Sequence, residues 1–254
     1  MPISSVHPLP YSADPGAYFA RLRHAPGAVL LDSGRPGAER GRYDILSAWP
    51  LAELAPGTDE SANDFLARLR QSLHSLGPAT LPDEYELPFV GGLLGYLAYD
   101  FGRRLEPMPN QAADDLGLAD ARFGLYAWAL ISDHQRGTSQ LVCHPQLPAD
   151  ERERLLALLQ QPAPAAPQPF RLNARFSADT PRERYKQAIE TIQAYILAGD
   201  CYQVNLTFPM VAELVSGTAL GLYGAFRRTG PVGHGAFVDL GVGPVVVSRS
   251  PELF

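Results

Sequence analysis

The residues best suited to chemistry lie in a loop that runs from position 33 to position 44, between two predicted strands. This loop carries the hydroxyl of Ser33, the guanidinium groups of Arg35, Arg40 and Arg42, and several backbone amides. Because guanidinium groups bind carboxylates through paired, charge-assisted hydrogen bonds, the set suits a small molecule that bears a carboxylate. A solvated surface loop has the same composition, so both interpretations stay open.

A second candidate is Glu252, at the end of the segment Ser-Arg-Ser-Pro-Glu over 248–252. A carboxyl group held behind a proline at the end of a buried strand is a candidate general acid or base. A surface carboxylate at a strand end explains the same residues and is the simpler interpretation of the segment alone. The segment taken alone therefore favours a surface carboxylate over a catalytic one.

Other kinds of site have less support. None of the six histidines pairs with another at a spacing of four, and Cys143 and Cys201 have no companion at metal-ligand spacing, so no metal site is predicted. No Gly-x-Ser-x-Gly nucleophile motif is present. The segment 91–96 has the glycines of a phosphate loop, but it continues as a strand without a lysine. We interpret these glycines as points of close approach between strands.

The overall composition is that of a folded, acidic protein. Apolar residues make up 46% and charged residues 19% of the 254 positions, and the formal net charge is −6. This charge disfavours nucleic acid or an anionic membrane as the main partner. No run of about 18 apolar residues is present to span a membrane, and no export signal follows Met1. Together with two widely spaced cysteines, these features predict a cytoplasmic protein in a reducing compartment.

The elements that position these residues fall into two parts, separated by a segment at 160–170 that holds four prolines. In the first part, apolar spacing and capping residues predict helices at 14–22, 61–76 and 149–159. Strands are predicted at 28–31, 43–46, 89–101, 122–133 and 139–142, the last two joined by a hairpin turn.

The second part opens with a helix that is predicted to begin at a Thr180 cap, with Glu183 completing a capping box, and to end at Gly199. Alternating polar and apolar residues predict a strand over 202–208 with one polar face. A short helix at 219–228 and strands at 235–240 and 245–248 follow.

Five ordered segments resemble the aminodeoxychorismate synthase component I family, a branch of the chorismate-utilising enzymes. They lie at 30–34, 88–96, 128–136, 198–206 and 250–252. The segment at 198–206 (AGDCYQVNL) is similar to the family hallmark, whereas the related anthranilate synthase component I typically has a phenylalanine-containing version without asparagine. The stretch from Cys201 to Asn205 therefore favours the p-aminobenzoate branch.

This resemblance implies a fold and a domain organisation. The fold is α+β, with large, mostly antiparallel sheets and helices on the outside. Residues 1–165 correspond to the N-terminal domain of component I, and residues 166–254 to the start of the chorismate-binding domain, which is incomplete here.

The resemblance also implies a reaction. A partner glutamine amidotransferase (component II) supplies ammonia, and component I converts chorismate to 4-amino-4-deoxychorismate for p-aminobenzoate and folate synthesis. Mg²⁺ holds a carboxylate of chorismate, and in the lysine-dependent branch a lysine adds to the ring as the 4-hydroxyl departs. Glu252 matches the family glutamate that helps this hydroxyl to leave, as general acid and base.

The family's nucleophilic lysine and its Mg²⁺-binding glutamates are expected beyond Phe254. The single lysine here, Lys186, lies in the first turn of a predicted helix and in no such motif. We therefore expect a chain that begins at a native Met1, is truncated just after Glu252, and is inactive by itself.

The resemblance gives the 33–44 loop a role in a site that binds tryptophan, structural in this branch and inhibitory in the anthranilate branch. The other wall of that site is implied just before 236–237. The family usually has Pro-Phe or Pro-Tyr where this chain has Gly-His, so a different ligand, or none, is the alternative. The implied residues of the two walls are Ser33, Arg40, Gly41, Arg42, Tyr43, Gly233, His234 and Gly235.

Two other functions remain open. One is that of anthranilate synthase component I, a lyase that releases pyruvate from chorismate. The other is that of a non-catalytic module that binds a tryptophan-type amino acid through the Ser33 loop.

Overall fold

The computed structural model describes residues 1–22, 24–39, 41–109, 114, 116–162, 164, 170–241 and 244–249. Two compact units are present: residues 1–166 with 223–254 form the first, and residues 167–222 form the second. The chain returns to the first unit because its last strands pair with a strand near its beginning. The domains expected from the family resemblance are 1–165 and 166–254, whereas the compact units place residues 223–254 with the first part of the chain. The expected domain boundary of the family stays a prediction.

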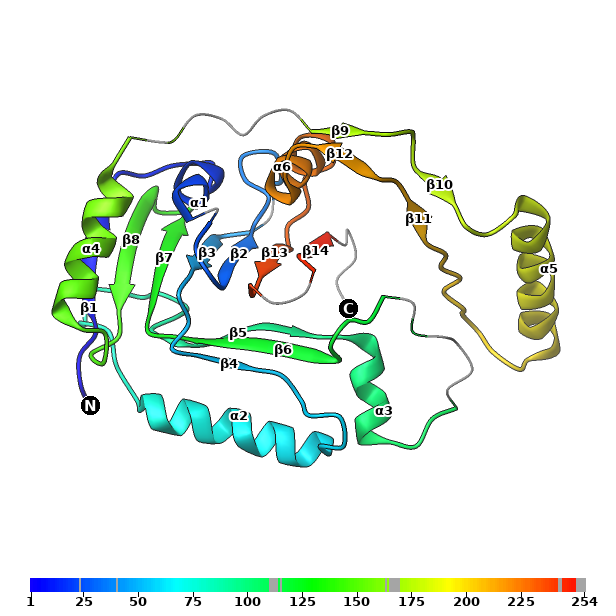
Figure 1. Cartoon of the computed structure of the whole chain (residues 1–254), viewed down its shortest axis with the longest axis horizontal. Coiled ribbons are helices and arrows are strands. Elements are labelled where there is room, and N and C mark those ends of the chain that lie inside the picture. The colour runs from blue at the N-terminus through cyan, green and yellow to red at the C-terminus, as the bar shows by residue number, and fades with distance from the viewer. Residues whose placement is uncertain are drawn as a thin grey trace. The chain divides into compact units, whose positions relative to one another are not determined.

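Seven strands form the main sheet of the first unit, and every neighbouring pair is antiparallel (Figure 1). Aliphatic runs such as 28–31 favour strands because their side chains pack well on a buried, pleated surface. The order across the sheet is β1 (Ser5–Leu9), β8 (Thr138–Cys143), β7 (Trp128–Asp133), β3 (Tyr43–Ser47), β2 (Ala28–Asp32), β13 (Gly235–Asp239) and β14 (Val246–Arg249).

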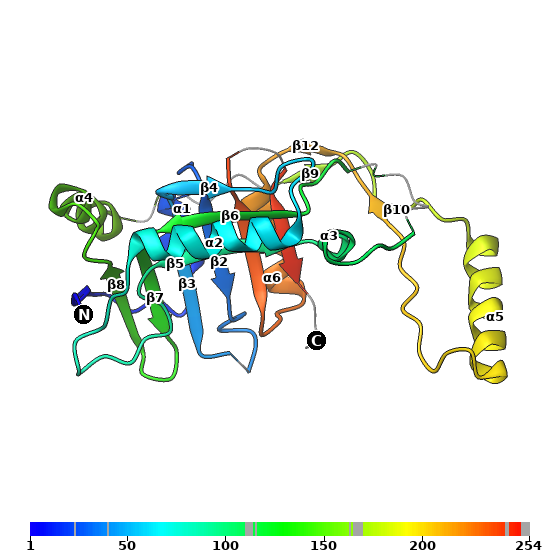
Figure 2. The same ribbon diagram turned by 90° about the horizontal axis from the view of Figure 1, so that it is seen from below.

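A second sheet of three antiparallel strands lies between a long helix and the main sheet (Figure 2). On the helix side its core includes the fully buried Phe65, and on the other side Leu94 and Tyr126 pack with residues of the main sheet. Leu93 and Leu94 belong to different sides, as the alternation of side chains along a strand requires. The elements are β4 (Ala52–Leu54), β6 (Ala121–Tyr126), β5 (Gly92–Leu97) and α2 (Ala62–Leu76).

Close approach of strands explains a glycine in β5. A Cβ atom added at Gly95 would lie 2.0 Å from the backbone oxygen of Arg122 on β6. No real side chain tolerates that distance, so the position requires glycine. The interpretation of this glycine as a point of close approach is therefore confirmed.

Helices cover the other face of the main sheet. The ring of Phe237 on β13 contacts Phe19 at a centroid distance of 5.4 Å and Tyr223 at 5.6 Å. These contacts place α1 and the end of α6 over that strand, and Figure 1 shows both helices on this side. The outer helices are α1 (Gly16–Leu22), α4 (Ala149–Gln160) and α6 (Ala219–Thr229), and a short turn of helix, η1 (Tyr99–Phe101) with α3 (Gly102–Leu105), follows β5.

The first unit therefore has the predicted α+β fold, with large antiparallel sheets and helices on the outside. The helices predicted at 14–22, 61–76, 149–159 and 219–228 are all present. Within the described part of the chain, no helix has the length and apolar character that a bilayer crossing requires.

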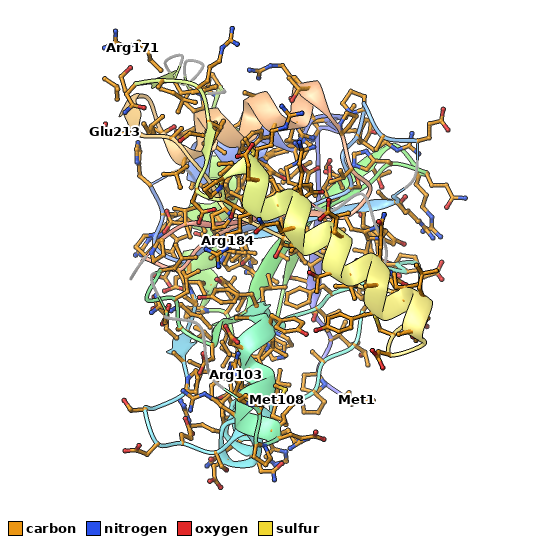
Figure 3. The ribbon with its side chains drawn as sticks, turned by 90° about the vertical axis from the view of Figure 1, so that its right-hand side faces the viewer. Met1, Arg103, Met108, Arg171, Arg184 and Glu213 are labelled. Atoms are coloured by element: carbon orange, nitrogen blue, oxygen red, sulfur yellow. The ribbon has the colours of Figure 1, made fainter. Side chains whose placement is uncertain are left out.

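The described residues of the second unit form two short antiparallel strand pairs, one long helix and the first turn of α6 (Ala219–Thr229). None of the long helix's side chains is buried. Asn173 donates to a carboxylate oxygen of Glu213 at 2.9 Å, next to one of these strand pairs. Figure 3 labels Arg171 and Glu213, which lie at this pair. The elements are β9 (Arg171–Leu172) with β12 (Leu214–Ser216), β10 (Ser177–Ala178) with β11 (Met210–Val211), and α5 (Arg182–Ala198).

Two predictions for this unit need correction. The cap position of α5 is Pro181, and the Thr180 hydroxyl donates to Asp179 at 2.9 Å instead of closing a capping box with Glu183. The segment 202–208 contains no strand, because a strand needs hydrogen bonds to a neighbour and no described segment pairs with it. The predicted end of the helix at Gly199 is confirmed, since this glycine has a left-handed φ of 83°.

Two predictions for the first unit were too coarse. The region 89–101 holds a strand only over Gly92–Leu97, and it then turns into η1. The region 122–133 contains two strands, β6 and β7, which belong to different sheets. A continuous apolar run does not reveal where a chain passes from one sheet to the next.

Candidate functional site

Ser33 directly follows β2 and is buried, with 2% of its surface exposed. Its backbone N–H and its hydroxyl both donate to Oδ1 of Asp44, each at 2.7 Å. Asp44 lies on β3, the neighbour of β2 in the main sheet, so the sheet itself brings the two residues together. The Ser33 hydroxyl hydrogen is thus used internally, and its lone pairs remain to accept from another group.

The other oxygen of Asp44 meets a histidine. His134 Nε2 lies 2.7 Å from Asp44 Oδ2, and the Tyr11 hydroxyl lies 2.9 Å from His134 Nδ1. An ionised carboxylate only accepts, so this geometry places a hydrogen on Nε2 and lets Nδ1 accept from Tyr11. Burial raises the pKa of Asp44, and the hydrogen bonds from Ser33 and His134 act in the opposite direction.

Two glycines let the loop after β2 press against the segment before β13. A Cβ atom at Gly34 would lie 2.2 Å from the backbone oxygen of Val232, and one at Gly41 would lie 2.7 Å from the Ser33 Cβ. Gly41 has φ of 104°, which also favours glycine. The backbone oxygen of Gly233 is the third neighbour of that added atom, at 3.2 Å. The structure therefore brings Ser33, Gly41 and Gly233 together, as the two implied walls require.

Arg42 and Tyr43 have other partners. The Arg42 guanidinium donates to both oxygens of Asp133, with the shortest distance 2.8 Å, and it stacks over the Tyr43 ring at 4.6 Å. Burial alone acts to raise the pKa of Asp133, but hydrogen bonds from Arg42 and from the backbone of Gln135 and Arg136 outweigh it and lower the pKa. The Arg42 guanidinium is thus ion-paired with a buried carboxylate, while 34% of its own side chain stays exposed.

A second buried carboxylate, Asp32, lies immediately before Ser33. It accepts from the backbone N–H of Gly34 at 2.7 Å, from Arg227 Nε at 2.6 Å and from the hydroxyl of Tyr223. Arg227 also donates to Asp14 at 2.7 Å. Burial raises the pKa of Tyr223, and the neighbouring Asp32 adds to this effect. These contacts tie α6 to the loop that holds Ser33.

The remaining predicted residues are placed as follows. Gly235 lies opposite Asp32 in the β13–β2 register and is buried, whereas His234 is exposed. Arg35 donates to the backbone oxygen of Glu39 at 2.7 Å. Arg40 and Glu252 lie outside the described residues.

Sequence reasoning missed the residues that hold the site together. Asp32 and Arg227 are 195 positions apart, and Asp44 and His134 are 90 apart. No local pattern links such pairs. The only sequence signal was that Asp32 and His134 both fall inside segments with the family resemblance.

Comparison with known proteins places this fold in a family. A family model described as chorismate binding enzyme matches residues 27–254. The chain belongs to this family. Among curated proteins, aminodeoxychorismate synthase component 1 of Salmonella typhimurium is 36% identical over 97% of this chain and 55% of its own length. The corresponding protein of Escherichia coli is 35% identical over 93% of this chain and 53% of its own.

A second kind of relative within the family is similar as well. Anthranilate synthase component 1 of Thermus thermophilus is 37% identical over 93% of this chain and 52% of its own length. The chain thus spans about half the length of the curated relatives it matches.

Solved structures support the fold. The anthranilate synthase component I of Streptococcus pneumoniae superposes with a TM-score of 0.65 at 24% identity, over 85% of this chain and 51% of that one. The menaquinone-specific isochorismate synthase of Escherichia coli has a TM-score of 0.55 at 12% identity, over 98% of this chain and 50% of that one. At these identities the likeness concerns the fold alone.

The geometry limits what the Ser33 site can bind. Because the Ser33 hydroxyl donates to Asp44, a ligand atom that meets it must itself be a donor, such as an ammonium or another N–H group. Ser33 is almost completely covered, so a ligand has little access to it in this structure.

Proposed function

We propose that this chain is the N-terminal part of an aminodeoxychorismate synthase component I. The whole enzyme would convert chorismate and ammonia to 4-amino-4-deoxychorismate, the precursor of p-aminobenzoate in folate synthesis. The observation that carries this proposal is the 36% identity to such a protein across 97% of the chain. The hallmark-like stretch from Cys201 to Asn205 supports the same branch of the family.

A partner is part of the proposal. The relatives are named as component 1, which implies a second component, and we propose a glutamine amidotransferase that supplies ammonia. Both cysteines are free thiols, which supports a cytoplasmic, reducing location.

Glu252 is proposed as the general acid and base that helps the 4-hydroxyl of chorismate to leave. Its support is the match of Ser250-Pro251-Glu252 to the family motif. Among the described residues, no three His, Cys, Asp or Glu side chains form a group that could hold a metal ion. The described residues therefore do not supply a site for the Mg²⁺ of the family.

The enzymatic proposal is tested with the full-length protein. Chorismate and ammonium salt are supplied, and the products are separated by chromatography. We expect 4-amino-4-deoxychorismate, and a Glu252→Gln variant slower by about 10²-fold or more. Glu153→Gln, an exposed glutamate on α4 of the first unit, is the matched control and should keep its activity.

Anthranilate synthase component I is the second candidate, favoured by the 37% identity to the Thermus thermophilus protein. The same product analysis decides between the two enzymes. Release of anthranilate and pyruvate would assign the chain to that branch instead. An isolated 254-residue chain is expected to convert no chorismate, and turnover by it would contradict the proposed division of the active site.

We further propose that the Ser33 site binds an amino acid of the tryptophan type. The support is the adjacency of Ser33, Gly41 and Gly233, and a serine hydroxyl oriented to accept from an ammonium group. Calorimetry with L-tryptophan on the 254-residue chain tests this, with Ser33→Ala expected to bind about tenfold more weakly or worse. Ser75→Ala, on the exposed side of α2, is the control. No heat at millimolar tryptophan would leave the site without this ligand.

A further inference from the structure

A cavity of about 530 Å³ lies in the first unit, at the end of β7 opposite Asp133. It is therefore separate from the Ser33 site, which adjoins the other end of that strand. Its volume falls in the range of small-molecule sites, which is roughly 300–1,000 Å³. The walls are mainly apolar and come from the β3–β4 turn, β7 and α4, with Trp49, Leu51, Trp128, Leu155 and Leu158 among the lining residues.

Trp49 has an unusual backbone. Its φ is 53°, the one positive value at a non-glycine position among the described residues, and it precedes a proline, which disfavours this conformation further. Two hydrogen bonds impose the turn: Trp49 N–H donates to Pro26 O at 2.8 Å, and Leu51 N–H donates to Leu125 O at 2.7 Å. A bulky residue kept in a strained conformation, where glycine would fit without strain, points to a function for its side chain.

The side chains at the mouth leave apolar surface uncovered. Trp49 is 42% and Leu51 49% exposed, whereas Trp128 is buried beneath them. The two indole rings are 6.2 Å apart at their centroids and tilted by 33°. A flat ring placed on the Trp49 indole and the leucines of α4 would cover this surface.

The charge at the mouth selects the sign of the ligand. Arg154 and Glu151 both line the cavity, but Arg154 is paired with Asp150 at 3.0 Å. Glu151 forms no ion pair with any described residue. Counted together with Asp150, which lies beside the cavity on the same helix, Glu151 and Arg154 leave one excess negative charge at the mouth. The face of an exposed indole also attracts cations.

We propose that this cavity binds a planar aromatic ligand that carries a positive charge. The ring of the ligand packs on Trp49, Leu155 and Leu158, and its cationic group lies beside the Glu151 carboxylate. Nothing in this proposal depends on the chorismate reaction or on the Ser33 site.

The chain offers a direct signal for the test, because it contains two tryptophans and both line the cavity. Selectively excited tryptophan fluorescence of the 254-residue chain is titrated with three nitroaromatics of one shape: 4-nitrobenzylammonium, 4-nitrobenzyl alcohol and 4-nitrophenylacetate. A bound nitroaromatic quenches the indoles and the effect saturates, whereas random collision gives quenching that rises without a limit. We expect saturation for the cation at about millimolar concentration or below, with the anion weakest.

Variants on α4 locate the binding. We expect the parent chain to bind the cation about fivefold more tightly than the alcohol, and Glu151→Gln should remove most of this difference. Glu153→Gln, on the same helix but outside the cavity, should leave it unchanged. Leu158→Arg should abolish saturable quenching, while Ala157→Arg, exposed on the same helix, should not. Circular dichroism confirms that each variant is folded, and Glu151→Gln carries the test if Leu158→Arg does not fold.

Two results would overturn the proposal. One is quenching that does not saturate with any of the three compounds, which would show that the cavity does not hold an aromatic ring of this kind. The other is saturation that survives in Leu158→Arg or is strongest for the anion. Either result leaves the enzymatic proposal untouched, since that proposal is judged by the reaction products.

Discussion

Replacing Asp44 by asparagine should leave the protein almost as stable as the parent, whereas replacing it by alanine should be severe. In the parent, Asp44 accepts from the Ser33 N–H, the Ser33 hydroxyl and His134. An asparagine oxygen can keep both bonds from Ser33. Its amide group can donate to His134 Nε2 if the histidine hydrogen moves to Nδ1 and is then donated to the Tyr11 hydroxyl.

Alanine keeps none of these bonds. It leaves three buried polar groups without a partner, and each costs about 1–3 kcal/mol of stability. Because the three groups are neighbours and the structure around them can adjust, the total cost is smaller than the sum of the three. We expect a loss of about 3–5 kcal/mol for Asp44→Ala and a change within about 1 kcal/mol for Asp44→Asn. Urea unfolding followed by tryptophan fluorescence measures both, provided that the slope against denaturant stays constant.

The pH dependence gives a second measure of the same idea. Burial raises the folded-state pKa of Asp44 above its ordinary value. The folded protein therefore binds a proton at Asp44 more tightly than the unfolded chain does. This adds to the free energy of unfolding at low pH, and the addition is lost as pH rises through the folded pKa. Asparagine does not titrate. The stability of Asp44→Asn relative to the parent should therefore increase as pH rises from below 3.8 towards neutral. An asparagine variant as unstable as the alanine variant, or a stability difference that falls with rising pH, would refute this reasoning.

Three further substitutions test the rest of the network by thermal or urea unfolding. Gly41→Ala should lower the free energy of unfolding by about 1–3 kcal/mol, because φ is 104° and the added Cβ would lie 2.7 Å from the Cβ of Ser33. An unchanged unfolding midpoint would contradict this close contact. Arg227→Met should cost about 3–5 kcal/mol, since it leaves the buried Asp32 without its guanidinium partner; a neutral effect would show that this carboxylate is not buried as an ion. Gly95→Ala should destabilise more than Gly41→Ala, because its Cβ would lie 2.0 Å from a backbone oxygen that cannot turn away; the opposite ranking would argue against the close packing of β5 on β6.

Most of the elements could be predicted from the sequence because their signals are local. The helix at 61–76 is an example: Ser61 accepts the cap hydrogen bond from Asp64 N–H at 3.1 Å, and Phe65 and Leu69 are buried at the predicted spacing. The hairpin between β7 and β8 is another, since its turn residues lie next to each other. Such features depend on residues within about one or two turns, which a single sequence displays directly.

The site could be predicted only in outline. Family resemblance pointed to Ser33 and to the segment before β13, and their adjacency follows from the sheet. Arg42 belongs to the implied site, and its guanidinium pairs with Asp133, a partner 91 positions away that no local pattern reveals. The composition of a loop shows which charges are available, but not which of them the rest of the fold neutralises.

The sequence by itself thus determined the class of fold, the helix boundaries to within a few residues, and the family, because propensity, capping and ordered motifs are all carried by neighbouring residues. Only the tertiary structure decided that 202–208 pairs with no described segment, that Asp32 and Asp44 are buried beside Ser33, and that Trp49 and Trp128 meet α4 at a cavity. The physical reason is that strand pairing, desolvation of charge and the shape of a cavity all depend on contacts between residues far apart in the chain. Such contacts exist only once the chain has folded.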